Sequence, residues 1–199
     1  MHLVLPRRLQ RTLALLLLLL SFAALPARAA DGVLVQARKL GDAVQVQAQA
    51  TVKAPHALIW KTLTDYDHLA EFVPGISKSR VLERRGAATL VEQTGTAHLW
   101  FFSYAIDVVV ESTEKPPHAI DIRMVRGNLK QLDGAYRLEQ VDGQADEFLL
   151  RWTGLIEPTL ALPLDIAVPL MRACIEEQFA GMVNEIARRD ALRVQGKAE

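Results

Sequence analysis

Three acidic side chains and one histidine stand close together in the stretch LTDYDHLAEFVPGI, residues 63–76. Asp67 and Glu71 are four residues apart, so on a helix they would share a face and could form a carboxylate pair. Asp65 and His68 stand beside them. Paired carboxylates and an adjacent histidine are the groups that general acid–base catalysis uses. This cluster is therefore the first candidate for an active site.

The apolar residues of the same stretch favour a structural role for its acids. They recur at helical spacing, at Leu63, Tyr66, Leu69, Phe72 and Ile76. This set takes the buried side of two short helices and leaves the acids in solvent. Thr64 and Asp67 also have the spacing of a capping box, and Pro74-Gly75 ends the second helix. We predict that the acids cap and solvate these helices while the apolar side covers a hydrophobic interior.

Other charged candidates lie in strand-like segments. The segment AIDIRMV (119–125) alternates, so Asp121 and Arg123 are predicted to face outward, opposite the isoleucines. A charge that faced an apolar interior would be costly unless paired, and it would orient a ligand. The side chains whose directions decide whether an interior acid or base exists are His98, Tyr104, Asp107, Asp121 and Arg123.

The sequence offers no familiar metal or nucleophile motif. Its five histidines form neither an HExxH motif nor a pair at i,i+4, so we predict no metal site. It also lacks GxSxG, GxGxxG and P-loop patterns, and no cofactor is predicted. Cys174 is the single cysteine, which excludes an intramolecular disulfide, and we predict it as a small buried residue on a helix.

The amino-terminal segment is typical of a secretory signal. A basic start is followed by an apolar run over residues 13–25, and Ala27 and Ala29 are small residues at the positions that a signal peptidase reads. The run is shorter than the roughly 20 residues that span a bilayer. We predict cleavage after Ala29 and a periplasmic location. An uncleaved membrane anchor is the alternative.

Charge and length limit the class of protein. The chain has 23 basic and 23 acidic residues, and residues 1–29 hold four arginines and no acid. The segment from residue 30 onward therefore carries 19 basic against 23 acidic residues, a net charge of −4. This balance argues against nucleic-acid binding and provides no polybasic patch for an anionic membrane. Its 170 residues suit one domain with one core.

The remaining patterns predict an α+β domain. After a lead-in at 30–41, residues 43–52 alternate as a half-buried strand, and Pro55 is suited to begin a helix. Residues 77–157 are a series of antiparallel strands separated by turn residues, which favours a meander. A long amphipathic helix follows, which begins or kinks at Pro169. Its apolar face is Leu164, Val168, Met171, Ile175, Phe179, Met182 and Ile186.

A curved sheet closed by one long helix leaves a space between them, and such spaces are lined by apolar and aromatic groups. The alternative for each of these residues is ordinary core packing. The predicted ligand-cavity residues are Trp60, Tyr66, Leu69, Phe72, Trp100, Tyr104, Trp152, Met171, Ile175, Phe179 and Met182.

Two motifs carry a resemblance to a known superfamily. WKTLTDYDHLAEFVPGISKSRVLERR (60–85) and GNLKQLDGAYRLEQV (127–141), followed by the helix at 169–193, resemble START-like (SRPBCC, helix-grip) proteins of the polyketide cyclase/dehydrase and coenzyme Q-binding branch. The resemblance covers residues 42–193 and leaves a tail at 194–199. It implies a sheet of about seven strands that grips the carboxy-terminal helix, two short helices between strands 1 and 2, and a deep apolar cavity.

The resemblance also implies a function. Members of this superfamily bind lipids, isoprenoid quinones, polyketides or hormones, and a few catalyse cyclisation or dehydration. We expect an exported protein that binds a hydrophobic small molecule for sequestration or transport, with transient membrane contact for ligand exchange. The alternative is a cyclase or dehydratase-type lyase with a cavity acid or base. A third possibility is an interaction module with a vestigial cavity, and the oligomeric state is left open.

Overall fold

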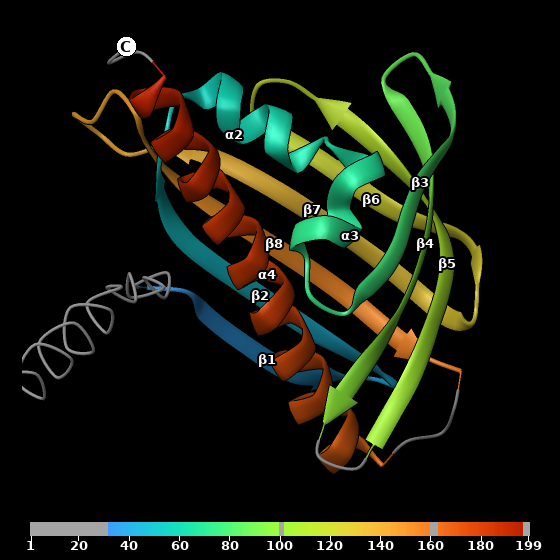
Figure 1. Ribbon diagram of the computed structural model, residues 1–199. Helices are drawn as coiled ribbons and strands as arrows, with labels where there is room; N and C mark the ends of the chain where they lie inside the picture. The colour runs from blue at the N-terminus through green and yellow to red at the C-terminus, as the bar shows by residue number, and fades with distance from the viewer. Residues whose placement is uncertain (1–31, 100–101, 160–162, 197–199) are drawn as a thin grey trace, which may run out of the picture.

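The computed structural model describes residues 32–99, 102–159 and 163–196 (Figure 1). The predicted signal segment, its cleavage site and Trp100 lie outside these residues. The amino-terminal half of the domain comprises β1 (Leu34–Leu40), β2 (Ala43–Lys53), α2 (His56–Leu63), η1 (Tyr66–His68), α3 (Leu69–Phe72), β3 (Ile76–Arg85) and β4 (Ala88–Leu99). It continues with β5 (Phe102–Lys115), β6 (Ala119–Gly127), β7 (Leu129–Gln140), β8 (Glu147–Pro158) and α4 (Leu164–Gln195).

The strands form one antiparallel sheet in the order β1-β2-β8-β7-β6-β5-β4-β3. Strands β3 to β8 are a meander, as predicted, and β2 pairs with the last of them. Helix α4 lies across one face of the curved sheet, and α2 and α3 lie beside it on the same face (Figure 1). This arrangement confirms the predicted α+β helix-grip architecture.

Two details of the prediction need correction. Residues 34–40, predicted as a lead-in, form strand β1, which pairs with β2 through the two-residue turn Gly41-Asp42. Gly41 has a φ of 62°, a conformation that glycine adopts without strain. The sheet therefore has eight described strands, and the short helices lie between β2 and β3. The strand escaped prediction because LVQARKL at this sheet edge is mostly exposed and its apolar residues do not alternate regularly.

Strand β2 and helix α4 show how the sequence pattern sets the core. Val44, Val46 and Val52 of β2 are buried, whereas Gln47 and Thr51 between them are exposed. Helix α4 begins at Leu164 and continues through Pro169, so Pro169 is not its start. Its buried residues on the sheet side are Ala167, Leu170, Met171, Ile175, Phe179, Met182, Val183 and Ile186.

Two glycines hold the segment after α3 in place. A Cβ on Gly95 of β4 would lie 2.0 Å from the Gly75 carbonyl oxygen. A Cβ on Gly181 of α4 would lie 2.5 Å from the Phe72 carbonyl oxygen and 2.4 Å from Cδ of Pro74. Backbone atoms cannot rotate away from such contacts. Residues 72–75 therefore pack directly against β4 and α4, because the glycines on both sides have no side chain to keep the segment away.

We expect Gly181→Ala to destabilise the fold by about 1–2 kcal/mol because the new methyl group meets backbone atoms. The result is diagnostic because alanine favours a helix over glycine by roughly 1 kcal/mol, so without the clash the protein would gain stability. Urea denaturation measures the change. Gly196→Ala is the control because a Cβ there has no contact closer than 3.5 Å. A Gly181→Ala protein as stable as the wild type would contradict this packing.

Candidate functional site

A cavity of about 180 Å³ lies between the sheet and α4. Strands β4 to β8 supply one wall, α4 supplies another, and residues of α2, η1, α3 and the following loop close one side. The alternation along β6 is as predicted: Ile120 and Ile122 line the cavity, and Asp121 and Arg123 do not. The cavity is therefore built from the inward residues of the sheet.

Seven of the eleven predicted cavity residues line this space: Tyr66, Leu69, Trp152, Met171, Ile175, Phe179 and Met182. Helix α4 contributes four of them at intervals of three and four residues, the spacing that keeps side chains on one helix face. Whether these residues contact a ligand stays a prediction. Trp100 falls outside the described residues.

Three of the predicted residues lie elsewhere. Trp60 stands one position after the buried Ile59 on α2, which turns it away from the cavity, and its ring stacks on His56 with 6.1 Å between centroids. Tyr104 donates a hydrogen bond from Oη to the Asn128 carbonyl at 2.9 Å. Both are aromatic residues in the correct segments, but the segment alone does not determine which way a side chain points.

Phe72 was misplaced because the predicted helical period is interrupted. Tyr66 begins a 3-10 turn, in which residues three apart are aligned, so Tyr66 and Leu69 both face the cavity. Helix α3 then has the α period, and Val73, four residues after Leu69, takes the inward position. Phe72 instead lies under the Arg189 guanidinium, 5.1 Å from its ring centroid.

The sheet contributes many lining residues that the sequence-based prediction omitted. The apolar ones include Val91, Ile106, Val108, Val110, Ile120, Ile122, Leu129, Leu132 and Ile156. The polar ones of the sheet are Gln93, Thr94, Thr96, Ser112 and Tyr136, and helix α4 adds Gln178. Strand alternation could have identified the isoleucines of β6. Tyr136 requires the register of β7 against β8, where it pairs with Trp152, and register is not visible in the sequence.

Trp152 lies against a pair of glycines. Gly134 and Gly154 are opposite each other on β7 and β8. A Cβ on Gly154 would lie 2.0 Å from the indole Cη2 of Trp152, and one on Gly134 would lie 3.4 Å from its Nε1. The indole therefore occupies the space that two side chains would fill. The two glycines let a large aromatic ring lie close to the sheet and form part of the cavity wall.

The side chains that line the cavity in the described part of the chain are all uncharged at neutral pH. The lining contains no Asp, Glu, Lys, Arg or His. Burial raises the pKa of Tyr136 to about 12, and burial together with Glu177 raises the pKa of Cys174 to about 11. Burial, with a further contribution from Glu114, raises the pKa of Tyr66 well above its ordinary value. None of these three groups exchanges a proton readily near pH 7.

The charged residues considered as interior acids or bases are engaged on the surface. Asp121 pairs with Lys115 and, at 2.7 Å, with Arg137. Arg123 contacts Glu111 at 3.0 Å. His98 and Asp107 are exposed and do not line the cavity. Among the described residues, therefore, no charged side chain lies where it could act as an acid or a base in this cavity.

The acidic cluster of residues 65–71 also has structural partners. Asp67 Oδ1 accepts a hydrogen bond from the Val81 backbone N–H at 2.7 Å, which attaches η1 to β3. Glu71 is exposed. The predicted capping box is wrong: Thr64 is the residue that ends α2, and its hydroxyl donates back to the Trp60 carbonyl at 2.9 Å. The expectation that these acids serve structure is otherwise consistent with their contacts.

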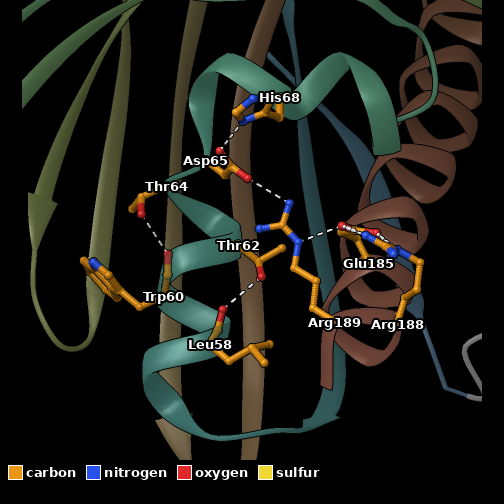
Figure 2. A network of polar contacts seen from close by, with 9 residues as sticks. All are labelled: Leu58, Trp60, Thr62, Thr64, Asp65, His68, Glu185, Arg188 and Arg189. Carbon is orange, nitrogen blue, oxygen red and sulfur yellow. Dashed lines mark hydrogen bonds and ion pairs between the residues drawn. The ribbon is translucent and has the colours of Figure 1, made fainter. Parts of the chain in front are cut away.

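Asp65 belongs to an ionic network that joins the short helices to α4 (Figure 2). Arg189 contacts Asp65 at 2.8 Å and Glu185 at 2.6 Å, and its guanidinium covers Phe72. We call these four residues the latch. Arg188 also pairs with Glu185, at 2.6 Å, from a more exposed position. The latch fastens the segment that closes one side of the cavity to the helix that forms its opposite wall.

Titration of the latch is expected to weaken the fold in acid. Hydrogen bonds from Arg188 and Arg189 hold the pKa of Glu185 below its ordinary 4.5, despite its burial. Burial raises the pKa of Asp65, but hydrogen bonds from His68 and Arg189 outweigh this and bring it below 3.8. Because both pKa values are depressed in the folded state, their stabilisation is complete above about pH 5 and is lost as the pH falls through the folded-state values.

We therefore expect the stability difference between wild type and Asp65→Asn to be largest near neutral pH and to shrink steadily below about pH 4. Urea midpoints measured from pH 7 to pH 2.5 give this difference directly. Asp107→Asn, an exposed carboxyl outside the latch, is the control. A wild-type advantage that stayed constant over this range would show that the Asp65 charge does not stabilise the fold.

Within the ranges that the structure describes, no group of three or more His, Cys, Asp or Glu side chains is arranged to hold a metal ion. No helix among the described residues is both long enough and apolar enough to span a membrane.

Comparisons with known structures agree on the fold. The STAR-related lipid transfer protein (fragment 25–204) of Xanthomonas axonopodis has a TM-score of 0.64 at 17% identity, over 79% of this chain and 95% of that one. The Zhui aromatase/cyclase of Streptomyces sp. R1128 has a TM-score of 0.63 at 20% identity, over 76% and 96%. A START superfamily protein of Mycobacterium smegmatis has a TM-score of 0.62 at 13% identity, over 72% and 97%.

Sequence comparison assigns the family. A search of curated protein sequences gave no significant match. A family model described as polyketide cyclase / dehydrase and lipid transport matches residues 52–189, which is more than half of the chain. That range includes the short helices, strands β3 to β8 and most of α4. The chain therefore belongs to the polyketide cyclase/dehydrase and lipid transport family, within the START-like fold.

Proposed function

We propose that this protein is exported to the periplasm and binds a hydrophobic small molecule in the cavity between the sheet and α4, for sequestration or transport. The observation that carries the proposal is the uncharged, mainly apolar lining of that cavity. A cavity of this composition gains free energy when apolar ligand surface leaves water. A lipid, an isoprenoid quinone or a polyketide-like molecule has the required surface.

The segment from α2 through the loop after α3 closes one side of the cavity, and we call it the closing segment. This segment and the latch that fastens it to α4 support a carrier role. At about 180 Å³ the cavity is smaller than the roughly 300–1,000 Å³ of typical ligand sites. A ligand of ordinary size therefore requires the segment from α2 to α3 to move away from α4. Opening would break the ion pairs of Arg189 and expose the buried apolar side of this segment, which includes Leu63, Leu69 and Val73, and apolar contact with a ligand would offset that cost. Transient contact with a membrane would allow a hydrophobic ligand to pass from the cavity into the lipid phase without crossing water.

Binding is favoured over catalysis by the cavity's titratable groups. The family also includes cyclases and dehydrases, whose chemistry moves protons. The titratable lining residues here are Tyr66, Tyr136 and Cys174, and burial raises the pKa of each. Such groups donate hydrogen bonds but are poor bases at neutral pH. The lining is therefore better suited to holding a molecule than to removing a proton from it.

A titration with the neutral fluorescent probe N-phenyl-1-naphthylamine tests the binding proposal. We expect one saturable site per chain, from which a solvent extract of the host's membranes displaces the probe. Absence of saturable binding, or binding that an extract cannot displace, would contradict the proposal. Boiled protein serves as the control for nonspecific partitioning of the probe.

Export is tested separately. Fractionation of the host cell followed by amino-terminal sequencing is expected to recover the protein from the periplasm with Ala30 as its first residue, because the signal pattern places cleavage after Ala29. Recovery in the cytoplasm with an intact amino terminus would refute the export part of the proposal and leave ligand binding to be judged by the titration.

A further inference from the structure

Two hydrogen-bond donors in the cavity wall have no protein partner. Tyr136 and Trp152 face each other on neighbouring strands and both line the cavity. Neither Oη of Tyr136 nor Nε1 of Trp152 bonds to any residue in the described ranges. No sealed side-chain nitrogen or oxygen in those ranges lacks a hydrogen-bond partner, so both donors open onto the cavity. Water can satisfy such open donors, but a ligand that fills the cavity without offering an acceptor would leave them unpaired, which is costly.

The other phenol in the cavity is already engaged. Tyr66 donates from Oη to Glu114 at 3.3 Å, so its hydroxyl is held by the protein. Burial is the cause that raises the pKa of Tyr136, and no hydrogen bond opposes it. The indole N–H of Trp152 is a donor only, and a phenol can donate as well as accept. Two donors on paired residues of neighbouring strands favour a ligand that offers an acceptor oxygen.

The lining also constrains the ligand's charge. It contains no cationic side chain among the described residues, so a carboxylate or phosphate inside would be buried without a counter-ion. The cost of such burial exceeds the gain from two neutral donors. It likewise contains no anionic side chain to receive an amine. Ionised amphiphiles are therefore poor occupants of the interior, although their apolar chains would fit.

We propose that the cavity selects uncharged hydrophobic molecules that carry an acceptor oxygen, such as a ketone, quinone or ester carbonyl, and that Tyr136 and Trp152 donate hydrogen bonds to that oxygen. This inference rests on the proposed ligand-binding function and specifies the ligand class. Tyr136 is then a specificity-determining residue, and the glycine pair Gly134 and Gly154 serves to place the Trp152 ring where its N–H reaches the same oxygen.

Three probes of one shape test the proposal: naphthalene, 2-acetylnaphthalene and 2-naphthoate, with binding measured by equilibrium dialysis at pH 8. They share a bicyclic apolar body and differ in the polar group. We expect 2-acetylnaphthalene to bind about tenfold more tightly than naphthalene, because two unpaired donors gain an acceptor. We expect 2-naphthoate to bind at least about 100-fold more weakly than the ketone, because its charge would be buried unpaired.

Variants identify the donors. Tyr136→Phe is expected to reduce the preference for 2-acetylnaphthalene over naphthalene to about threefold or less. Trp152→Phe removes the second donor and is expected to reduce the same preference, which provides an independent test if one variant folds poorly. Tyr104→Phe is the matched control, because its hydroxyl bonds to Asn128 outside the cavity. Thermal melts establish that each variant is folded.

The outcomes separate this inference from the proposed function. If the probes bind but the ketone has no advantage, or 2-naphthoate binds equally well, the selectivity is wrong and the binding function stands. If the preference survives in both Tyr136→Phe and Trp152→Phe, these residues are not the donors and the inference is overturned. If none of the probes binds folded wild-type protein, both this inference and the proposed function fail.

Discussion

Replacing Arg189 with methionine is expected to lower the free energy of unfolding by about 2–3 kcal/mol, because it leaves carboxylates at a buried site without their shared partner. Arg189 contacts Asp65 and Glu185, and the Glu185 side chain is only 7% exposed. Methionine keeps much of the apolar length of the arginine side chain, so the change reports mainly on the loss of the guanidinium, which makes both ion pairs and covers Phe72. Urea denaturation at pH 7 and at pH 3 measures it, and the loss should be smaller at pH 3, where the carboxylates are partly protonated.

The matched control for this variant is Arg188→Met. Arg188 contacts the same Glu185, but its side chain is 60% exposed and it has no bond to the closing segment. Exposed ion pairs typically contribute less than about 1 kcal/mol. Equal effects of the two substitutions would show that Arg189 acts only as a counter-charge for Glu185. That result would contradict its role in fastening the closing segment to α4.

Filling the cavity is expected to abolish ligand binding with little loss of stability. Ile122 lies on the inner face of β6, in the cavity wall. Tryptophan at this position projects an indole into space that a ligand would occupy. We expect Ile122→Trp to reduce affinity for N-phenyl-1-naphthylamine at least about 100-fold, a loss of roughly 3 kcal/mol of binding free energy. Cavity-filling substitutions often leave stability unchanged or increase it.

Val125→Trp provides the comparison for this experiment. Val125 lies on the same strand, is 54% exposed and does not line the cavity. It introduces the same side chain without entering the cavity, so its affinity for the probe should match wild type. Binding that survives in Ile122→Trp would place the probe outside this cavity.

The sequence predicted the elements well where a repeated pattern determined them. The strict alternation of β2 and the period of the apolar face of α4 each depend on several residues, and tertiary packing does not override them. Edge strand β1 was missed because it is mostly exposed and only two of its residues, Val35 and Ala37, pack against the core, too few to make an apolar alternation evident. Its local clue was the Gly41-Asp42 turn between two β-compatible segments.

The candidate site was predicted less completely because cavity direction depends on register and phase. The α4 residues were correctly placed because one helix face was evident from the sequence. Phe72 was misplaced by a change from a 3-10 to an α period, and Tyr136 was omitted because its importance follows from pairing with Trp152. The latch is also a tertiary feature. Asp65 and Arg189 are 124 residues apart, and no local pattern joins them.

Native mass spectrometry of the protein purified from its own host, with wild type and Ile122→Trp prepared in parallel, tests the central claim most directly. Gentle ionisation preserves a ligand that is buried in an apolar cavity, and solvent extraction then identifies it. The predicted result is one uncharged hydrophobic molecule per wild-type chain and none on Ile122→Trp. Wild-type protein that carries no such molecule, or two proteins that carry it equally, would contradict a ligand-binding role for the cavity.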